Sequence, residues 1–440
     1  MRTDRDSTVI IIGGGLAGCE AAYQLLRAGI SVKLYDMKPH KLSPAHSNVD
    51  NLCELVCSNS LKSDEPATAS GLLKAEMRIF GSLILEAAEN TRVPAGGALA
   101  VDRDEFAEYV TARLKSFEDL TIVSEEVDRI NTDGWTIVAT GPLTSDALVP
   151  DIRRLCGERL YFFDAAAPII TRESVGMTRA FMGGRYGKGG DDYINCPMTK
   201  EEYQVFWNEL VNAKRAELKD FEKKDIFEGC MPVEVMAARG ADTLRFGPLK
   251  PVGLTDPKTG KRPYAVVQLR TENREGTIYN LVGFQTNLTF GEQKRVFSLI
   301  PALSDAEFVK YGVMHRNTYI NSPACLNFDF SMRKYPKVYF SGQISGVEGY
   351  IESAMSGMIA GMSIARRIEG LESLKFSSNT MTGALCNYIS RGGANHAAGR
   401  ICPMNANFGI LPPLDAVIRD KKEKKTALYD RAMKEIVNNG

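Results

Sequence analysis

Two of the nine cysteines lie in sequence surroundings that suit a reactive thiol. Cys57 opens a run of small polar residues (57–60), and Cys230 lies in the segment FEGCMP (227–232), where glycine and proline constrain the chain. A cysteine attacks a substrate as the thiolate, so it needs partial exposure and a cation or a helix N-terminus nearby. From the pattern alone each of the two is a candidate nucleophile, and the alternative is a small buried apolar residue.

The other cysteines and the histidines predict no metal site. Cys53 and Cys57 would share one face of a helix, which is one arrangement for a metal or redox pair. Zinc sites usually add a second pair of ligands, however, and the four histidines show no ligand spacing: His40, His46, His315 and His396. We therefore expect the cysteines other than 57 and 230 to be bystanders in a reduced compartment.

A glycine-rich turn near the N-terminus predicts a nucleotide-binding βαβ unit. A β-branched strand, the turn (13–18) and a helix follow one another between residues 8 and 28. Gly13, Gly15 and Gly18 allow a tight turn, the close approach of a pyrophosphate and the packing of the helix on the strand. The helix N-terminus then favours the phosphates. The alternative is a turn with a structural role only.

The residues that follow favour FAD over free NAD as the nucleotide. Asp36 ends the next strand, 18 residues after Gly18, where a carboxylate accepts hydrogen bonds from an adenosine ribose. A later strand ends in Ala-Thr-Gly at Gly141, a pattern that many FAD proteins have beside the nucleotide. Gly342 and Gln343 stand between a late strand and a helix whose N-terminus can face the flavin. Because these features come from opposite ends of the chain, we expect an FAD site built from both.

The predicted fold class is α/β, with a Rossmann-like FAD-binding domain assembled from both termini and an inserted α+β domain. We place the first part of the FAD-binding domain at 1–165 and the inserted domain at 166–330. The second part, with a C-terminal helix, takes 331–440. Apolar periodicity in the first part predicts helices over 75–90 and 103–116.

Composition is that of a soluble enzyme. The 440 residues carry 54 Lys and Arg against 54 Asp and Glu, so the formal net charge is zero. This excludes a globally basic nucleic-acid coat protein and an acidic solvating tail, but a local basic patch remains compatible with it. The apolar run from Val9 to Gly18 lacks the features of a signal peptide, and no stretch approaches 18 uninterrupted apolar residues. We expect a cytoplasmic protein with no membrane partner.

Motifs along nearly the whole chain, from about residue 8 to about residue 415, match one known family. The matching runs are GGGLAGCEAAYQL, ELVCSNSLKS, GALAVDRDEFA, FDAAAPI, YGKGGDDYINCPMTKEEY, FEGCMPVEVMAARG, RFGPLKPVGL, GFQTNLTFGEQKRVF, HRNTYINSP, FSGQISGVEGYIESAMSGMIAG and PMNANFGILP. With them the sequence resembles the folate- and FAD-dependent tRNA (uracil-5-)-methyltransferases. FEGCMPVE together with GQISGVEGY is far more specific than the glycine turn.

The resemblance implies formation of 5-methyluridine at position 54 of the tRNA T-loop. It implies 5,10-methylenetetrahydrofolate as carbon donor, tetrahydrofolate as its product, and FAD, reduced by NADH or NADPH, as methylene carrier and hydride source. It places the two family cysteines on Cys57 and Cys230. We assign Cys230 to addition at uracil C6, and Cys57 to a second thiol that assists proton transfer or protects the flavin-methylene; the division of roles stays open.

The motifs and the resemblance together predict a set of cofactor-binding residues at the two ends of the chain. They are Gly13, Gly14, Gly15, Leu16, Ala17, Gly18, Asp36, Arg103, Gly141, Gly342, Gln343 and Gly349.

A local basic strip is the predicted contact with RNA. Between residues 245 and 274 seven Lys and Arg stand against two acidic residues: 245, 250, 258, 261, 262, 270 and 274. We predict RNA binding by Lys258, Lys261 and Arg262, because cations along such a strip neutralise phosphates. The alternative is a solvated charged face.

Other functions remain candidates from the sequence. The same chemistry on a ribosomal RNA uridine fits these residues equally. A small-molecule flavin oxidoreductase would need no FEGCMP cysteine, and a non-catalytic RNA-binding flavoprotein would bind tRNA without methylating it. The related wobble-uridine-modifying flavoproteins carry an additional C-terminal helical domain. NADH and NADPH are equal candidates, no obligate protein partner is evident, and the oligomeric state and the base at C5 stay open.

Overall fold

The structure is a computed structural model, and it describes residues 8–42, 46, 48–157, 159–165, 167–188, 190–216, 231–273, 276–312, 314–391 and 403–439. Of 159–165, 314–317 and 438–439 it describes the backbone alone. Cys230 lies outside the described residues.

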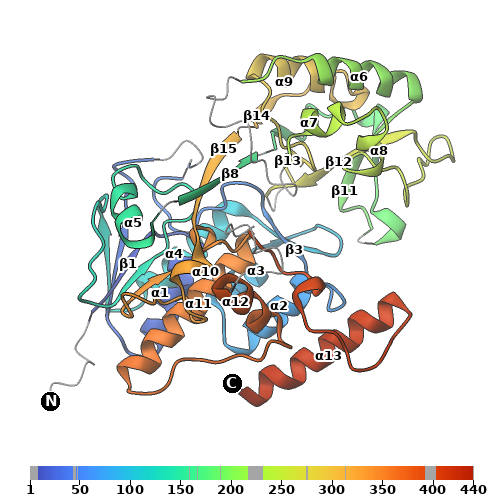
Figure 1. The fold of residues 1–440 in the computed structure, drawn as a ribbon. Coiled ribbons are helices and arrows are strands. Elements are labelled where there is room, and N and C mark those ends of the chain that lie inside the picture. The colour runs from blue at the N-terminus through green and yellow to red at the C-terminus, as the bar shows by residue number, and fades with distance from the viewer. Residues whose placement is uncertain are drawn as a thin grey trace.

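A five-stranded sheet forms the centre of the first unit (Figure 1). Its order is β16-β7-β1-β2-β6, and every neighbouring pair is parallel. The strands are β1 (Val9–Ile12), β2 (Val32–Asp36), β6 (Leu120–Ser124), β7 (Thr136–Val138) and β16 (Val338–Phe340). The Rossmann-like α/β class predicted from the sequence is confirmed. Because parallel strands align their carboxyl ends, the residues that follow β1, β2, β7 and β16 meet at one edge.

Helices and a small sheet complete this unit. The helices are α1 (Leu16–Arg27), α2 (Ala69–Ile79), α3 (Leu83–Asn90), α4 (Arg103–Lys115), α5 (Val149–Cys156), α10 (Ser322–Cys325), α11 (Tyr350–Ile368), α12 (Met381–Arg391) and α13 (Lys421–Asn439). The small sheet has the order β3-β5-β4, with β3 (Ser60–Ser63), β4 (Arg92–Val93) and β5 (Ala98–Val101). Figure 1 shows α13 along the base of the unit, near α2.

A six-stranded antiparallel sheet carries the second unit, in the order β10-β11-β12-β13-β9-β14. Its strands are β9 (Ile169–Thr171), β10 (Phe181–Met182), β11 (Tyr193–Met198), β12 (Ala265–Thr271), β13 (Ile278–Leu281) and β14 (Phe308–Lys310). Its helices are α6 (Lys200–Asn212), α7 (Val233–Ala238), α8 (Thr243–Phe246) and α9 (Phe290–Phe297). An antiparallel ribbon of β8 (Arg159–Ala165) and β15 (Met314–Ile320) runs between the two units in Figure 1.

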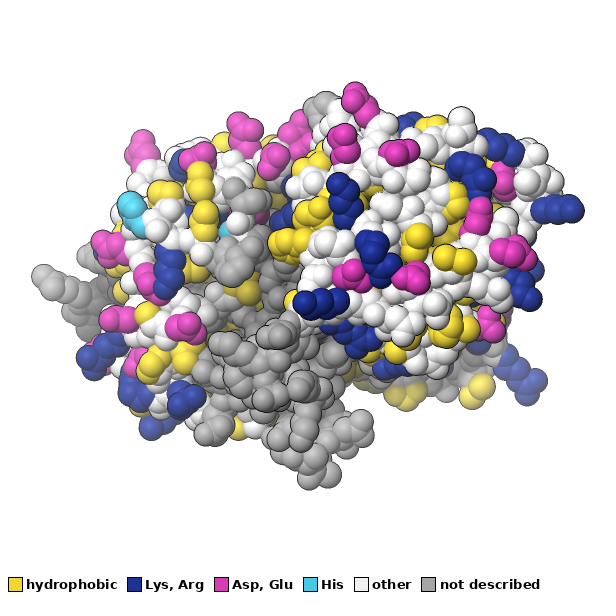
Figure 2. All heavy atoms as spheres, turned by 90° about the horizontal axis from the view of Figure 1, so that it is seen from above, with side chains coloured by type: hydrophobic (Ala, Val, Ile, Leu, Met, Phe, Trp, Pro, Cys, Tyr) yellow, Lys and Arg dark blue, Asp and Glu magenta, His cyan; other side chains and the backbone are white. Residues whose placement is uncertain are grey.

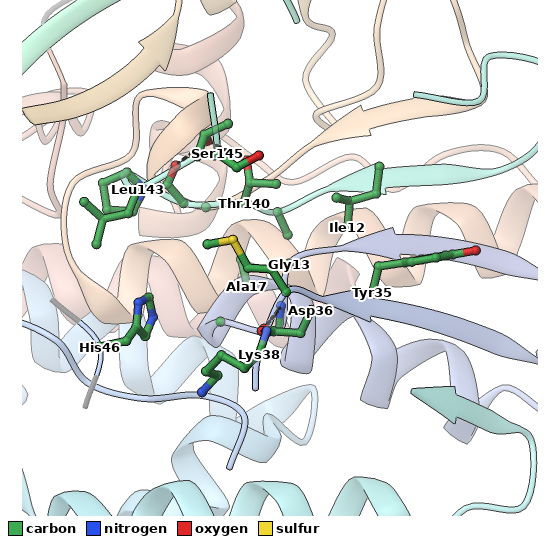
Figure 3. A pocket seen from close by; sticks show the side chains of 18 of the residues that line it. Ile12, Gly13, Ala17, Tyr35, Asp36, Lys38, His46, Thr140, Leu143 and Ser145 are labelled. Carbon is green, nitrogen blue, oxygen red and sulfur yellow. Dashed lines mark hydrogen bonds between the residues drawn. The ribbon is translucent and has the colours of Figure 1, made fainter. Parts of the chain in front are cut away.

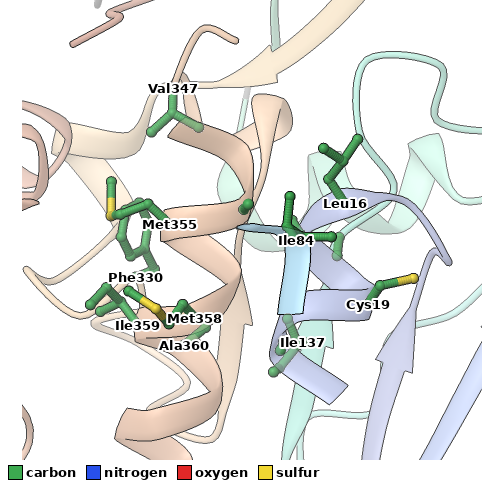
Figure 4. Close-up of a cluster of buried hydrophobic side chains, with 14 of the residues drawn as sticks. Leu16, Cys19, Ile84, Ile137, Phe330, Val347, Met355, Met358, Ile359 and Ala360 are labelled. Atoms are coloured by element: carbon green, nitrogen blue, oxygen red, sulfur yellow. The ribbon is translucent and has the colours of Figure 1, made fainter. Parts of the chain in front are cut away.

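Each unit has a hydrophobic core of its own. One cluster of buried side chains joins residues 9–155 to residues 319–436, and another lies within 167–306. Figure 4 shows part of the first cluster: Met355, Met358 and Ile359 of α11 lie beside Phe330. We propose that the two cores are two domains; the boundaries at residues 165 and 330 stay a prediction.

The first core depends on the close packing of α1 against α11. A Cβ atom added to Gly357 of α11 would lie 2.0 Å from the carbonyl oxygen of Ala17. One turn on, a Cβ at Gly361 would lie 2.7 Å from the carbonyl oxygen of Ala21. The two helices therefore touch through their backbones, which only glycine permits. This contact ties the N-terminal βαβ unit to the C-terminal part of the chain.

The single helix predicted over 75–90 is wrong. The chain forms α2 and α3 instead, separated at Gly81, whose φ of +70° lies outside the helical region. Ser82 caps α3 by accepting a hydrogen bond from the Leu85 amide, and its hydroxyl donates to the buried carboxylate of Glu20 at 2.7 Å. A tertiary contact with α1 thus ends one helix and starts the next. The helix predicted over 103–116 corresponds to α4.

Replacement of Gly357 by alanine is expected to destabilise the first unit by about 1–3 kcal/mol, because the new methyl group forces the helices apart. The matched control is Gly291→Ala in α9, where an added Cβ meets no atom within 4 Å. We expect this control to be neutral or to stabilise by up to about 1 kcal/mol. Scanning calorimetry of both variants tests the contact, and equal melting temperatures would contradict it.

Candidate active site

A large pocket opens at the carboxyl edge of the parallel sheet, with a volume of about 1090 Å³ that includes open solvent. Figure 3 shows Gly13 and Asp36 at the strand ends, with His46 and Lys38 on one side and Thr140 and Ser145 on the other. The wall is made by residues 12–17, 35–38, 125–127, 139–145, 342 and 343, with Lys41, His46, Glu54, Val56, Leu148, Tyr350 and Ser353. The ends of all five strands, β1, β2, β6, β7 and β16, thus contribute to one site.

The glycine turn leaves backbone exposed to the pocket. Gly13 has a φ of +110°, and a Cβ there would lie 2.5 Å from the Ala139 carbonyl oxygen. A Cβ at Gly18 would lie 1.9 Å from the carbonyl oxygen of Gly13, whereas one at Gly15 meets nothing within 4 Å. Gly15 therefore faces open space at the start of α1, which no side chain caps. Such a helix N-terminus attracts an anionic group.

Asp36 is held in place by two backbone amides. Gly14 donates to its Oδ2 atom at 3.0 Å, and Lys38 donates to Oδ1 at 2.9 Å. A carboxylate has about four acceptor positions, so Asp36 can still accept bonds from a ligand hydroxyl. The turn and the acid are thus fixed relative to each other before any ligand binds.

The N-terminus of α11 reaches the same pocket from the other end of the chain. Gly342 follows β16 with a φ of +79°, and its amide donates to the Ser356 hydroxyl of α11 at 2.6 Å. Gly349 precedes α11 with a φ of +114° and no side-chain cap. Two uncapped helix N-termini, those of α1 and α11, therefore converge on one pocket. Their dipoles make it suitable for a ligand with negative charge.

The loop that carries Cys57 forms part of the pocket rim. Val56 lines the pocket, and Cys57, which is partly exposed, comes next. The amides of Cys57 and Ser58 donate to the hydroxyl of Tyr350 at 2.7 and 3.1 Å. Burial raises the pKa of Tyr350, and Cys57 adds to this effect while Arg103 opposes it. The hydroxyl is therefore neutral and serves as an acceptor that holds the cysteine loop against α11.

Arg103 supports the cysteine loop from its other side. Its guanidinium donates to the carbonyl oxygens of Leu55, at 2.7 Å, and Cys57, at 3.4 Å. It also pairs with Glu272 of the second unit, whose side chain is 1% exposed. Burial disfavours the charge of Arg103, but Glu272, Tyr350 and Cys57 together outweigh burial, so the pKa of Arg103 is raised. Arg103, predicted to bind the cofactor, joins the cysteine loop to the second unit and is not among the residues that line the pocket; its role toward the cofactor stays a prediction.

Asn59 makes a second link between the units. Its side-chain amide donates to the carbonyl oxygens of Val101, in β5, and Thr271, in β12, both at 2.9 Å. Its Oδ1 atom accepts a hydrogen bond from Arg270 at 3.1 Å. The loop is therefore held by groups from both units. It follows that its position depends on how the units dock.

Comparisons with known proteins agree with this geometry. Residues 8–372 match the family model of "Glucose inhibited division protein A". The chain is 57% identical to methylenetetrahydrofolate--tRNA-(uracil-5-)-methyltransferase TrmFO of Acetivibrio thermocellus, with 96% of both chains covered. It is 54% identical to the TrmFO of Lactobacillus gasseri, with 97% of both covered. The chain belongs to the TrmFO family. The family and the enzyme class predicted from the sequence are confirmed.

Solved structures support the fold. GidA of Aquifex aeolicus in its form I crystal superposes with a TM-score of 0.70 at 16% identity, over 98% of this chain and 75% of that chain. The form II crystal gives a TM-score of 0.69 at 15% identity, over 100% of this chain and 74% of that chain. At such identities the likeness concerns the fold alone.

The residues of the predicted basic strip differ in their exposure and in their hydrogen-bond partners. Lys258, Lys261 and Arg262 are all exposed, and the Lys258 ammonium in addition donates to the carbonyl oxygens of Met177, Thr178 and Ala180 at 3.0, 2.6 and 3.1 Å. Arg270, counted in the strip, is 8% exposed and binds Asn59 instead of facing solvent. Arg274 lies outside the described residues. Figure 2 shows basic and acidic side chains interspersed on the visible face of the second unit.

Sequence reasoning missed Tyr350, Asn59 and Glu272 as supports of the site. Two sequence features could have indicated them. Tyr350 is the last residue of the motif GQISGVEGY, and Glu272 is an acidic residue directly after the buried strand β12. In the described part of the chain, His, Cys, Asp and Glu form no group of three or more fit to hold a metal. No helix described there is long and apolar enough to cross a membrane.

Replacement of Tyr350 by phenylalanine is expected to loosen the cysteine loop. The change leaves two amides without their acceptor, at a cost of about 1–3 kcal/mol. Hydrogen-exchange mass spectrometry of a peptide containing Cys57 and Ser58 should show faster exchange in the variant. The control is Tyr109→Phe, whose hydroxyl donates to Glu86 at 2.8 Å and touches neither amide. Equal exchange in the Tyr350 variant and the wild type would rule out this support.

Proposed function

We propose that this protein transfers the one-carbon unit of 5,10-methylenetetrahydrofolate to C5 of a uridine in the T-loop of tRNA, with FAD bound in the pocket. One observation carries the proposal: two helix N-termini converge on a pocket at the carboxyl edge of the parallel sheet, and the residue before Cys57 lines it. The names of its relatives, which share more than half of its residues, state the folate donor, the tRNA and the uracil.

The residues of the pocket fit FAD. The turn leaves open space at Gly15, where a pyrophosphate can approach, and α1 directs its amides there. Asp36 has acceptor positions left for an adenosine ribose. Gly342 and Gln343, before α11, would face the flavin end of the cofactor. When bound and reduced by NADH or NADPH, FAD supplies the hydride of the reaction.

The chemistry of uracil explains why a thiol is needed. Uracil C5 is a poor nucleophile, and addition of a thiolate at C6 turns C5 into an enolate-like carbon that attacks the folate methylene. Loss of the C5 proton and breakage of the carbon–nitrogen bond to tetrahydrofolate then leave an exocyclic methylene on C5. A hydride added to this methylene gives the methyl group and expels the thiolate from C6, which restores the C5–C6 double bond. We assign the addition to Cys230, on the strength of the FEGCMPVE motif.

Cys57 has a different task in this proposal. Its loop is fixed by Tyr350, Arg103 and Asn59, so its thiol keeps a defined position at the pocket rim. A second thiol there can move a proton at the substrate or protect the reactive one-carbon unit. The target uridine must leave its stack to reach either thiol, since the pocket lies within the protein.

The test is nucleoside mass spectrometry of an unmodified tRNA transcript after incubation with the protein, methylenetetrahydrofolate and a reduced nicotinamide nucleotide. We expect 5-methyluridine from the wild type and none from Cys230→Ala, which should also fail to form a covalent adduct with 5-fluorouridine tRNA while retaining its flavin. Cys156→Ser is the control and should methylate normally. If Cys230→Ala methylates at a rate close to that of the wild type, the assignment of the nucleophile is wrong.

The basic strip gives a separate prediction about RNA affinity. Neutralising Lys261 and Arg262 together should weaken tRNA binding and lower the salt dependence of log Kd by about 1–2, because exposed cations release counterions. Lys258→Ala should mainly destabilise the segment 177–180, whose carbonyl groups hold its ammonium. Unchanged tRNA affinity of the double variant at low salt would remove this strip from the binding surface.

A further inference from the structure

Three aromatic rings form a stack at the edge of the second unit. Phe308 and Tyr311 lie with ring centroids 5.1 Å apart and planes 8° apart. Tyr311 and Phe290 continue the stack at 4.9 Å and 16°. Stacked and edge-to-face contacts are the two arrangements that aromatic pairs prefer, and here both contacts are of the stacked kind. The three rings therefore present a flat series and not an ordinary core cluster.

The stack runs from the core outward. Phe308 packs against the hydrophobic core of the second unit, whereas Phe290, the first residue of α9, is 55% exposed. The exposed part of this side chain contributes no hydrophobic stabilisation to folding, because its surface stays in water. One face of its ring is ordered by Tyr311 and much of the rest is open. Such a ring is ready to stack with a planar ligand.

The stack lies on the side of the second unit that faces the cysteine loop. β14 is the last strand of its sheet and stands beside the connecting ribbon in Figure 1. Lys310, between Phe308 and Tyr311, is half-buried; burial lowers its pKa, Arg103 lowers it further, and Glu54, Glu272 and Cys57 oppose the shift. Lys310 is thus within electrostatic reach of groups from both units around Cys57.

The charges around the outer ring suit a phosphate backbone. Lys294 follows Phe290 by four residues on α9, so both lie on one face of the helix, and both are exposed. The nearest acid on that helix, Glu292, is paired with Arg295 at 2.8 Å. Single-stranded nucleic acids are bound by this combination of aromatic platform and cations.

We propose that Phe290 is the outer face of a platform that stacks with an unpaired base of the RNA substrate, next to the uridine that enters the site. The inference rests on the proposed RNA methylation and concerns how the protein binds its RNA substrate. Proteins recognise loops of RNA by stacking splayed bases on aromatic side chains, and every base offers such a face. The pterin of the folate is the competing planar ligand.

The experiment compares Phe290→Ala, Phe290→Trp and the wild type, each purified with its flavin. Binding of an unmodified tRNA transcript, followed by fluorescence anisotropy, should weaken about tenfold in the alanine variant, equivalent to about 1.4 kcal/mol, and recover with tryptophan. The control is Val205→Ala, since Val205 is 55% exposed on α6 of the same unit, outside the basic strip. It should bind as the wild type does.

A spectroscopic probe reports stacking directly. A T-arm hairpin with 2-aminopurine beside the target uridine should lose fluorescence on binding the wild type and the tryptophan variant, and less on binding Phe290→Ala. Equal tRNA affinity and equal quenching for Phe290→Ala and the wild type would overturn the platform. So would unchanged RNA affinity with a raised KM for methylenetetrahydrofolate, which would assign the ring to the folate. A wild-type protein that neither binds nor methylates tRNA would instead overturn the proposed function.

Discussion

The contact between α1 and α11 is the constraint on which the site depends. Gly357 brings α11 against the carbonyl group of Ala17, so two helices from opposite ends of the chain share one contact and direct their N-termini at one pocket. Any side chain at that position would part the helices and separate the two N-termini. The electrostatics of the pocket is thus a consequence of a packing contact between backbones.

The cysteine loop depends in turn on the docking of the two units. Tyr350 holds it from α11, Arg103 from α4 and Asn59 from within the loop, and the last two reach Glu272 and Thr271 of the second unit. A buried ion pair such as Arg103 with Glu272 contributes little net stability, but it defines a geometry, because either charge left alone in the interface is costly. We infer that this pair serves the alignment of Cys57 with the pocket.

The nucleotide half of the site could be predicted from the sequence because it rests on short-range patterns. Gly13, Asp36 and Gly342 each follow a strand, and parallel strands bring such positions to one edge. Partners set by tertiary packing could not be predicted. The support that Arg103 gives to the cysteine loop and the backbone carbonyls that hold the ammonium of Lys258 were not foreseen, while the predicted roles of these residues toward the cofactor and RNA stay predictions. The position of a charged residue along the chain does not reveal which hydrogen-bond acceptors the fold brings close to its side chain.

The proposed function requires that the carbon added to the RNA comes from the folate and is completed by a hydride at this site. Its most direct test uses 5,10-methylenetetrahydrofolate with both methylene hydrogens replaced by deuterium, an unmodified tRNA and an unlabelled reductant. Mass spectrometry of the nucleosides should find 5-methyluridine with two deuterium atoms in its methyl group. Unlabelled 5-methyluridine would show that the carbon does not come from the folate, and no 5-methyluridine at all from flavin-loaded wild-type protein would rule out the proposed function.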